Sequence, residues 1–240
     1  TLIPEGEDKL ESVAMRGGGF LAFSMHNAHD KVTFHDKSGK QLRELDLPVI
    51  GSVSGFGGKP EDSEVFYALT SFTYPSTIFH LDLKSGKSTE YRRSAVDFNP
   101  DDYETRQVFY DSKDGTKVPM FLVHKKGLEP SGDHPTYLYG YGGFNVSLQP
   151  SFSVSIVAWL EQGGVYAQPT LRGGGELGED WHEAGMLEKK QNVFDDFAAA
   201  AEWLIANKIT RPERLAIGGG SNCGRLPSGG KRARAPGTTA

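Results

Sequence analysis

The feature that most constrains this chain is a short apolar run that ends in glycines and a serine, Leu215-Ala216-Ile217-Gly218-Gly219-Gly220-Ser221-Asn222-Cys223-Gly224. Such a run is typical of a buried strand that ends in a tight turn. The spacing Gly219-x-Ser221-x-Cys223 approximates G-x-S-x-G, the turn that lifts a nucleophilic serine hydroxyl above the edge of a sheet. Two interpretations stay open at this point: a nucleophile at Ser221, or a glycine-rich turn without chemistry.

Length and composition bound the class of protein. The 240 residues, 37% of them hydrophobic and 11% aromatic, allow one large domain or parts of two, with a packed core. A net charge of −5 favours neither nucleic acid nor an anionic membrane as a partner. No apolar run approaches the roughly 20 residues of a membrane span. The single cysteine excludes an internal disulfide and suits a reducing compartment, so we expect a cytoplasmic protein.

The first residues are polar, without the basic and apolar regions of a signal peptide, and the chain does not begin with methionine. We therefore expect an upstream region to be missing.

Short strands punctuated by turns are predicted in the first part of the chain. They are Phe20–His26, Lys31–Asp36, Gln41–Leu47, Val65–Leu69, Thr77–Leu83 and Ser88–Arg92. The turn string Lys-Ser-Gly-Lys occurs twice, at Lys37–Lys40 and Lys84–Lys87, and its copies are 47 residues apart. That spacing is close to one four-stranded propeller blade. Two copies fit about two blades, but unrelated β-hairpins remain an alternative.

The pattern changes near Val96. A hairpin is predicted from Gln107–Tyr110 and Val118–His124, joined by Asp114-Gly115. Strands then alternate with helical patterns, which predicts an α/β domain with a largely parallel sheet. The strands are Thr136–Tyr139, Val165–Ala167 and Arg214–Ile217, and the helices are Ser151–Gln162 and Phe194–Asn207.

The second helix has an apolar stripe that predicts a face packed in the core, formed by Phe194, Phe197, Ala198, Ala201 and Ile205. Asp195 and Asp196 are expected in its first turn, where carboxylates interact favourably with the helix dipole.

Two glycine-rich loops are candidate ligand-binding segments. Tyr139–Phe144 follows a predicted strand, and its paired glycines resemble the loop that supplies an oxyanion donor in α/β-hydrolases. An aromatic-glycine turn packed on the core is the alternative. Leu171–Gly178 contains G-x-G-x-x-G, but Glu176 and Glu179 would repel a pyrophosphate, so a tight loop anchored by Arg172 is preferred over a dinucleotide site.

No metal site is predicted. The seven histidines lie mostly in β-hairpins and lack the spacing of zinc ligands. Cys223 has no basic partner nearby in the sequence and is interpreted as a packing residue rather than a nucleophile.

Residues 225–240 differ from the rest of the chain. They contain the basic residues Arg225, Lys231, Arg232 and Arg234, no acidic residue, and helix-breaking prolines and glycines. We expect a solvated, disordered basic tail rather than a nucleic-acid-binding segment.

Taken together, several strings resemble the prolyl oligopeptidase family of serine peptidases. They are Ser112–Phe121, Tyr139–Phe144, Arg172–Gly178 with Trp181-His182, Lys190–Phe197 and Gly219–Asn222. The resemblance implies the last blades of a β-propeller in residues 1–97 and an incomplete α/β-hydrolase domain in residues 98–224. The expected fold class is therefore α/β plus all-β.

The resemblance also implies site residues. Ser221 matches the nucleophile, the Tyr141 side-chain hydroxyl and the Asn222 backbone N–H match the oxyanion donors, and Phe144 matches an aromatic residue near the proline-binding pocket. The implied activity is hydrolysis of short peptides after proline through an acyl-enzyme, by a monomeric parent enzyme without cofactors. Two alternatives are an esterase with the same serine turn and a non-catalytic β-rich binding module.

The sequence departs from the family in several places. In α/β-hydrolases the order along the chain is Ser, then Asp or Glu, then His, but no Asp, Glu or His follows Ser221. Leu226–Gly230 cannot continue a helix after the serine turn, and Pro169 stands where a strand is expected. We therefore expect a fragment, inactive by itself, whose tail reflects a truncated or frame-shifted reading.

Overall fold

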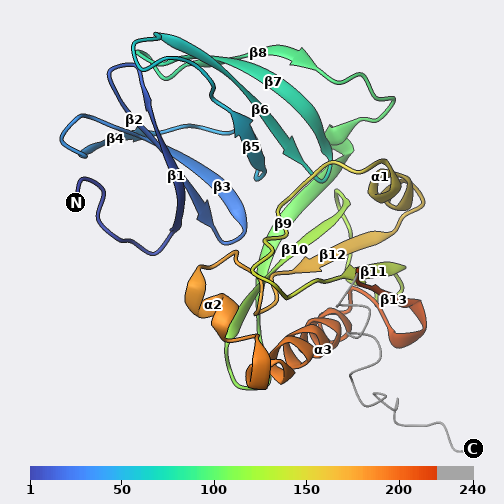
Figure 1. Cartoon of the computed structure of the whole chain (residues 1–240). Helices are drawn as coiled ribbons and strands as arrows, with labels where there is room; N and C mark the ends of the chain where they lie inside the picture. The colour runs from blue at the N-terminus through green and yellow to red at the C-terminus, as the bar shows by residue number, and fades with distance from the viewer. Residues whose placement is uncertain (221–240) are drawn as a thin grey trace, which may run out of the picture. The chain divides into compact units, whose positions relative to one another are not determined.

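The structure is a computed structural model that describes residues 1–220 (Figure 1). It contains two compact units. The first is Thr1–Phe98 together with Gln149–Ser153, and the second is Asn99–Leu148 together with the chain from Val154 onward. Ser221, Asn222 and the basic tail lie outside the described residues.

The first unit consists of two four-stranded antiparallel sheets, each built from consecutive strands. One sheet contains β1 (Lys9–Arg16), β2 (Gly19–His26), β3 (His29–His35) and β4 (Gln41–Glu44). The other contains β5 (Ser52–Gly55), β6 (Glu64–Ser71), β7 (Tyr74–Asp82) and β8 (Ser88–Arg93). In each sheet the strands follow in sequence order, as in one propeller blade.

The repeated turn string has the same structural role in both sheets, where it joins the third strand to the fourth. The Asp36 carboxylate accepts hydrogen bonds from the backbone N–H and hydroxyl of Ser38, at 2.8 and 2.5 Å. The Asp82 carboxylate accepts the same pair from Ser85, at 2.6 and 2.7 Å. The 47-residue spacing therefore marks two copies of one unit, and the six predicted strands are all present.

Two further strands, β1 and β5, were missed by the sequence analysis. Most side chains of β1 are exposed or half-buried, so the strand lacks the alternation of apolar and polar residues that identifies a half-buried strand. β5 has only four residues, two of them serines.

The two sheets of the first unit share one apolar core. Leu21, Val32 and Phe34 of the first sheet and Val65, Tyr67 and Leu81 of the second belong to the same buried cluster. Within this core Tyr67 stacks between Phe56 and Phe79, with ring centroids 4.8 and 5.2 Å away. The first unit is therefore a partial β-propeller in which two blades pack face to face.

The second unit is built on a five-stranded mixed sheet with the order β13-β11-β12-β10-β9. Its strands are β9 (Tyr103–Asp111), β10 (Lys117–Lys125), β11 (Thr136–Tyr139), β12 (Val165–Pro169) and β13 (Leu215–Gly218). Only β11 with β12 and β11 with β13 pair in parallel. The three strands that follow the predicted hairpin, β11, β12 and β13, are parallel as expected, and the β9–β10 hairpin adds two antiparallel pairings that make the sheet mixed.

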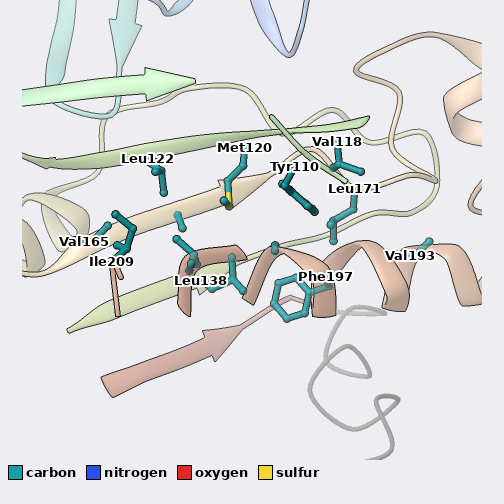
Figure 2. Close-up of a cluster of buried hydrophobic side chains, with 13 residues drawn as sticks. Tyr110, Val118, Met120, Leu122, Leu138, Val165, Leu171, Val193, Phe197 and Ile209 are labelled. Atoms are coloured by element: carbon teal, nitrogen blue, oxygen red, sulfur yellow. The ribbon is translucent and has the colours of Figure 1, made fainter. Parts of the chain in front are cut away.

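One short helix precedes this sheet in the sequence, and the other helices of the second unit connect its strands. In chain order the helices are η1 (Pro100–Asp102), α1 (Val154–Glu161), α2 (Glu179–Glu183), η2 (Leu187–Lys189), α3 (Gln191–Ala206) and η3 (Pro212–Arg214). Figure 2 shows the core between the sheet and α3, a single buried cluster that includes Met120, Leu122 and Leu138 of the sheet and Phe197 and Val193 of the helix. The second unit is thus a partial α/β-hydrolase domain.

The buried face of α3 differs from the predicted stripe. Its fully buried residues are Val193, Asp196, Phe197, Ala200 and Leu204, whereas Ala198 is exposed. The helix also begins at Gln191, so Asp195 and Asp196 lie beyond its first turn and the predicted dipole role was wrong. The face is rotated because a buried ion pair at Asp196, described below, turns that position toward the core.

Pro169 is accommodated at the end of β12. It lies opposite Met120 of β10, and the next residue, Thr170, donates its backbone N–H to the Pro119 carbonyl at 2.8 Å. The antiparallel pairing therefore continues past the proline. Among residues 1–220, no helix combines the length and apolar character needed to span a bilayer.

Candidate functional site

The two loops singled out in the sequence begin side by side at one edge of the second sheet. β11 and β13 are parallel neighbours in which Tyr139 pairs with Gly218. The backbone N–H of Gly140 then donates to the Gly218 carbonyl at 3.2 Å. Because both strands end at the same edge, the Tyr139–Phe144 loop and the segment that leads into Ser221 leave the sheet together.

Contact between these loops extends to the last described residue. A Cβ atom placed on Gly220 would lie 3.4 Å from the Tyr139 hydroxyl oxygen, an ordinary van der Waals distance. The residue that precedes Ser221 is therefore adjacent to the strand that carries the Tyr141 loop.

Two glycines seat the Tyr141 loop tightly on its support. A Cβ atom on Gly140 would lie 2.8 Å from Leu171 Cδ1 and 2.9 Å from Phe197 Cε2. One on Gly142 would lie 2.5 Å from Val193 Cγ1 and 2.7 Å from Leu171 Cβ, and the φ angle of Gly142 is +59°. Only glycine fits both positions, so the packing itself explains the paired-glycine pattern.

The side chains between and after these glycines take different positions. Tyr141 is half-buried and packs against the core cluster of the second unit. Phe144 is 73% exposed and has a φ of +53°, a conformation that is uncommon for a bulky residue. An exposed aromatic ring held by a strained backbone is available to contact a ligand.

A second anchor holds the carbonyl side of the loop. The Lys190 ammonium donates a hydrogen bond to the Gly142 carbonyl at 2.7 Å, and the Asn145 backbone N–H donates to the Gly173 carbonyl at 3.1 Å. No sequence pattern assigns a role to Lys190. Nothing in the local sequence relates it to a glycine 48 positions away, so only the folded chain reveals this contact.

The loop that begins at Leu171 is anchored by Arg172, as predicted. Arg172 is 4% exposed, and its Nη2 donates to Asp196 Oδ1 at 2.6 Å while its Nη1 donates to Asp114 Oδ2 at 2.6 Å. Ser112 also donates its hydroxyl to Asp196 Oδ1, at 2.5 Å. Arg172 therefore bridges a fully buried carboxylate on α3 and a partly exposed carboxylate in the β9–β10 turn.

These contacts shift the titration of the groups involved. The hydrogen bond from Arg172 holds the pKa of the Asp114 carboxyl well below its usual range. Burial opposes the charge on Arg172, but hydrogen bonds to Asp196 and Asp114 outweigh it and raise the pKa of the guanidinium. Burial also raises the pKa of the Tyr110 phenol, which stays protonated and donates to the Asp196 carbonyl at 2.9 Å.

The structure thus brings together part of the predicted site. Tyr141 and Phe144 lie on one loop, and that loop starts beside the segment that leads into Ser221. The positions of Ser221 and Asn222 relative to it remain predictions, since both residues lie outside the described part of the chain. The G-x-G-x-x-G segment is a tight turn held by Arg172, and α2, which follows it, has only five residues.

Comparisons with known proteins agree with this architecture. The profile described as "Prolyl oligopeptidase family" matches residues 150–227, and the profile described as "Prolyl oligopeptidase, N-terminal beta-propeller domain" matches residues 1–94. The prolyl endopeptidase of Elizabethkingia miricola is 49% identical over 210 residues, which cover 88% of this chain and 30% of that protein. Prolyl oligopeptidase A of Galerina marginata is 41% identical over 233 residues, covering 95% of this chain and 31% of that protein.

Solved structures show the same likeness. A structure from a study of two prolyl endopeptidases superimposes with a TM-score of 0.88 at 48% identity, covering 94% of this chain and 34% of that one. Prolyl oligopeptidase B from Galerina marginata, bound to a 25mer macrocyclization substrate, gives a TM-score of 0.87 at 39% identity, covering 94% and 32%. The chain spans about a third of the length of the relatives that it matches.

Proposed function

We propose that this chain, which belongs to the prolyl oligopeptidase family of serine peptidases, forms part of an endopeptidase that hydrolyses short peptides on the C-terminal side of proline. In this proposal residues 1–97 supply the last propeller blades and residues 98–224 supply the first part of the catalytic domain. Residues 225–240 have no catalytic role in it.

The chemistry assigned to the site is acyl transfer. The Ser221 hydroxyl oxygen attacks the carbonyl carbon of the prolyl residue, and its proton passes to a general base. The negative charge that develops on the carbonyl oxygen is stabilised by hydrogen bonds from the Tyr141 hydroxyl and the Asn222 backbone N–H, and each such donor is worth about 3–4 kcal/mol of barrier. The base returns the proton to the amine, which leaves as the C–N bond breaks, and water then hydrolyses the acyl-enzyme and restores the serine hydroxyl.

One structural observation carries this proposal. The pairing of Tyr139 with Gly218 in adjacent parallel strands makes the Tyr141 loop and the segment that leads into Ser221 leave the sheet at the same edge. Phe144, exposed on that loop, is assigned to contact the proline ring of the substrate.

The acid and base of the triad are not assigned to residues of this sequence. In the α/β-hydrolase order both follow the serine, and residues 222–240 contain no Asp, Glu or His. A serine without a base is a poor nucleophile, so the 240-residue polypeptide by itself is expected to show no serine-dependent hydrolysis.

A chimera tests the proposal. Residues 1–223 of this chain replace the matching stretch of the Elizabethkingia miricola prolyl endopeptidase, which supplies the rest of its own sequence. The chimera is expected to release nitroaniline from a prolyl nitroanilide peptide. Ser221→Ala should abolish this turnover, and Tyr141→Phe should lower kcat by about 10²–10³ with KM little changed.

The same assay separates the alternatives. Cleavage of short acyl esters without cleavage of prolyl peptides would replace the peptidase assignment by an esterase. Turnover that survives Ser221→Ala would remove the nucleophile assignment. Turnover by the 240-residue chain itself, lost in Ser221→Ala, would refute its inactivity.

The finer parts of the proposal concern partners and location. We assign short proline-containing peptides as substrates and a monomeric, cytoplasmic parent enzyme without nucleic-acid or membrane partners. The net charge of −5 and the single cysteine support these assignments.

A further inference from the structure

The Tyr141 loop rests in a slot with two walls. One wall is α3, through Val193 and Phe197, and the other is the Leu171 side chain with the backbone carbonyl of Arg172. A Cβ atom added to Gly140 or Gly142 would lie too close to atoms of these walls, so both glycines are in tight contact with them. The position of Tyr141, which lies between the two glycines, therefore depends on the spacing of the walls.

A single buried ion pair joins the two walls. Arg172 follows Leu171 in one wall, and Asp196 lies on α3 between Val193 and Phe197 in the other. The Asp196 carboxylate accepts the Arg172 backbone N–H at 3.1 Å, its Nε at 3.0 and 3.1 Å, and its Nη2 at 2.6 Å. Four contacts on one carboxylate fix both the distance and the angle between the walls.

Stability alone does not account for such a pair. Burying two charges costs several kcal/mol in desolvation, and well-packed apolar residues in their place are often equally stable. A directional pair instead fixes one geometry. An oxyanion donor needs that geometry, since it acts only when its donor atom lies about 2.7–3.1 Å from the developing charge.

We propose that Arg172 and Asp196 are positioning residues that set the place of the Tyr141 hydroxyl for catalysis. This inference rests on the proposed function, in which that hydroxyl stabilises the oxyanion. Neither charged group contacts the substrate, and both act through Leu171 and the glycines of the loop. A displacement of the donor by about 1 Å can cost up to 10²-fold in rate.

Kinetics of the chimera described above test the proposal through a double-mutant cycle. Arg172→Lys keeps the charge and removes the fork of donors, and it is expected to lower kcat by about 10- to 100-fold with KM little changed. Tyr141→Phe removes the positioned hydroxyl, so the double variant should have the same kcat as Tyr141→Phe alone. Asp195→Asn is the matched control, because this neighbouring carboxylate contacts Gln191 and Lys113 instead of Arg172.

The possible outcomes separate the two proposals. If the fold-losses in kcat from Arg172→Lys and Tyr141→Phe multiply in the double variant, the two residues act independently. That result would overturn the positioning role and leave the oxyanion role intact. No loss from Tyr141→Phe alone would overturn the oxyanion role itself. If KM of the Arg172→Lys variant rises by as much as its kcat falls, the positioning role is also overturned.

A second variant distinguishes a loss of positioning from unfolding of the protein. Arg172→Met with Asp196→Leu replaces the pair by apolar side chains and should fold, yet it should show the same low kcat as Arg172→Lys. In the 240-residue chain, amide exchange of residues 140–146 should accelerate in this variant and not in Asp195→Asn. Unchanged exchange in that segment, or full kcat in the apolar variant, would overturn the proposal.

Discussion

Gly140 donates its backbone N–H to the carbonyl oxygen of Gly218 at 3.2 Å, one residue beyond the point where Tyr139 pairs with Gly218 itself. This bond joins two segments that are 78 positions apart in the sequence. It extends the contact between the two strands past the end of β11, into the loop that follows that strand. Backbone pairing between β11 and β13 therefore brings the two segments of the candidate site together, and side-chain contacts add to it.

The tight seating of the Tyr141 loop predicts a large effect of Gly142→Ala. The new Cβ would meet Val193 and Leu171 within 2.7 Å, at a φ of +59°. Overpacking costs about 1–3 kcal/mol, and a positive φ in a residue with a Cβ adds about 1–2 kcal/mol. The free energy of unfolding, measured by urea denaturation, should fall by about the sum of these two costs.

Gly163→Ala is the matched control, because Gly163 has a φ of +80° and no atom lies within 4 Å of the place that the new methyl group would take. Gly163→Ala should lower the free energy of unfolding only by the cost of the positive φ. Equal losses in the two variants would mean that the packing of Gly142 contributes nothing.

The pair between Arg172 and Asp114 predicts a dependence of stability on acid pH. Arg172 lowers the folded-state pKa of Asp114 below its ordinary value of 3.8. The stabilisation is therefore complete above that value and is lost as the pH falls through the lower folded-state pKa. The free energy of unfolding should differ between wild type and Asp114→Asn by a constant amount near neutral pH, and the difference should shrink below about pH 4.

The Asp114 side chain is 48% exposed, so high salt should reduce this difference at every pH. Asp111→Asn is the control, because it removes an exposed pair with Lys117 that is expected to contribute little. A difference for Asp114→Asn that grows on acidification would contradict the assignment.

Tyr110 predicts a cost for losing one buried hydroxyl. Its Oη donates to the Asp196 carbonyl at 2.9 Å, and the residue is 2% exposed. Tyr110→Phe leaves that carbonyl without this donor and should lower the free energy of unfolding by about 1–3 kcal/mol. Tyr91→Phe, at a residue that is 67% exposed, should change it by less than about 0.5 kcal/mol. Chemical denaturation measures both, and similar values would refute the buried hydrogen bond.

Phe144 predicts a specific effect on substrate recognition. The ring is 73% exposed, so Phe144→Ala should leave the thermal midpoint unchanged. In the chimera it should lower kcat/KM for a prolyl substrate about tenfold, the equivalent of roughly 1.4 kcal/mol of lost ring contact. A matched peptide with alanine in place of proline is the control substrate. An equal loss for both substrates would show that Phe144 does not read the proline ring.

Much of the fold could be predicted because the signals are local. The Asp36 and Asp82 turns depend on a serine two or three residues along the chain, and the glycine that follows permits the turn. The β9–β10 hairpin is visible for the same reason, through Asp114-Gly115 between two apolar runs. The weakly patterned β1 and the short β5 have no such signal and were missed.

The candidate site shows the limit of local reasoning. The strings of the Tyr141 loop and of the Ser221 turn predict acyl-transfer chemistry through their resemblance to the family. The buried face of α3 was misjudged because Phe194 and Ala198 fit an apolar stripe as well as Val193 and Ala200 do. The choice between them depends on Arg172, which lies 24 positions before Asp196 and pairs with it only in the folded chain.

By itself, therefore, the sequence determined the turns, the strands with clear alternation and the family resemblance, since each depends on neighbouring residues or on recognisable strings. Tertiary structure alone decided the strand order, the pairing of Tyr139 with Gly218, and the ion pair that joins the walls around Tyr141. These are long-range contacts, and their free energy depends on burial and on the exclusion of water, which arise only when distant segments pack together.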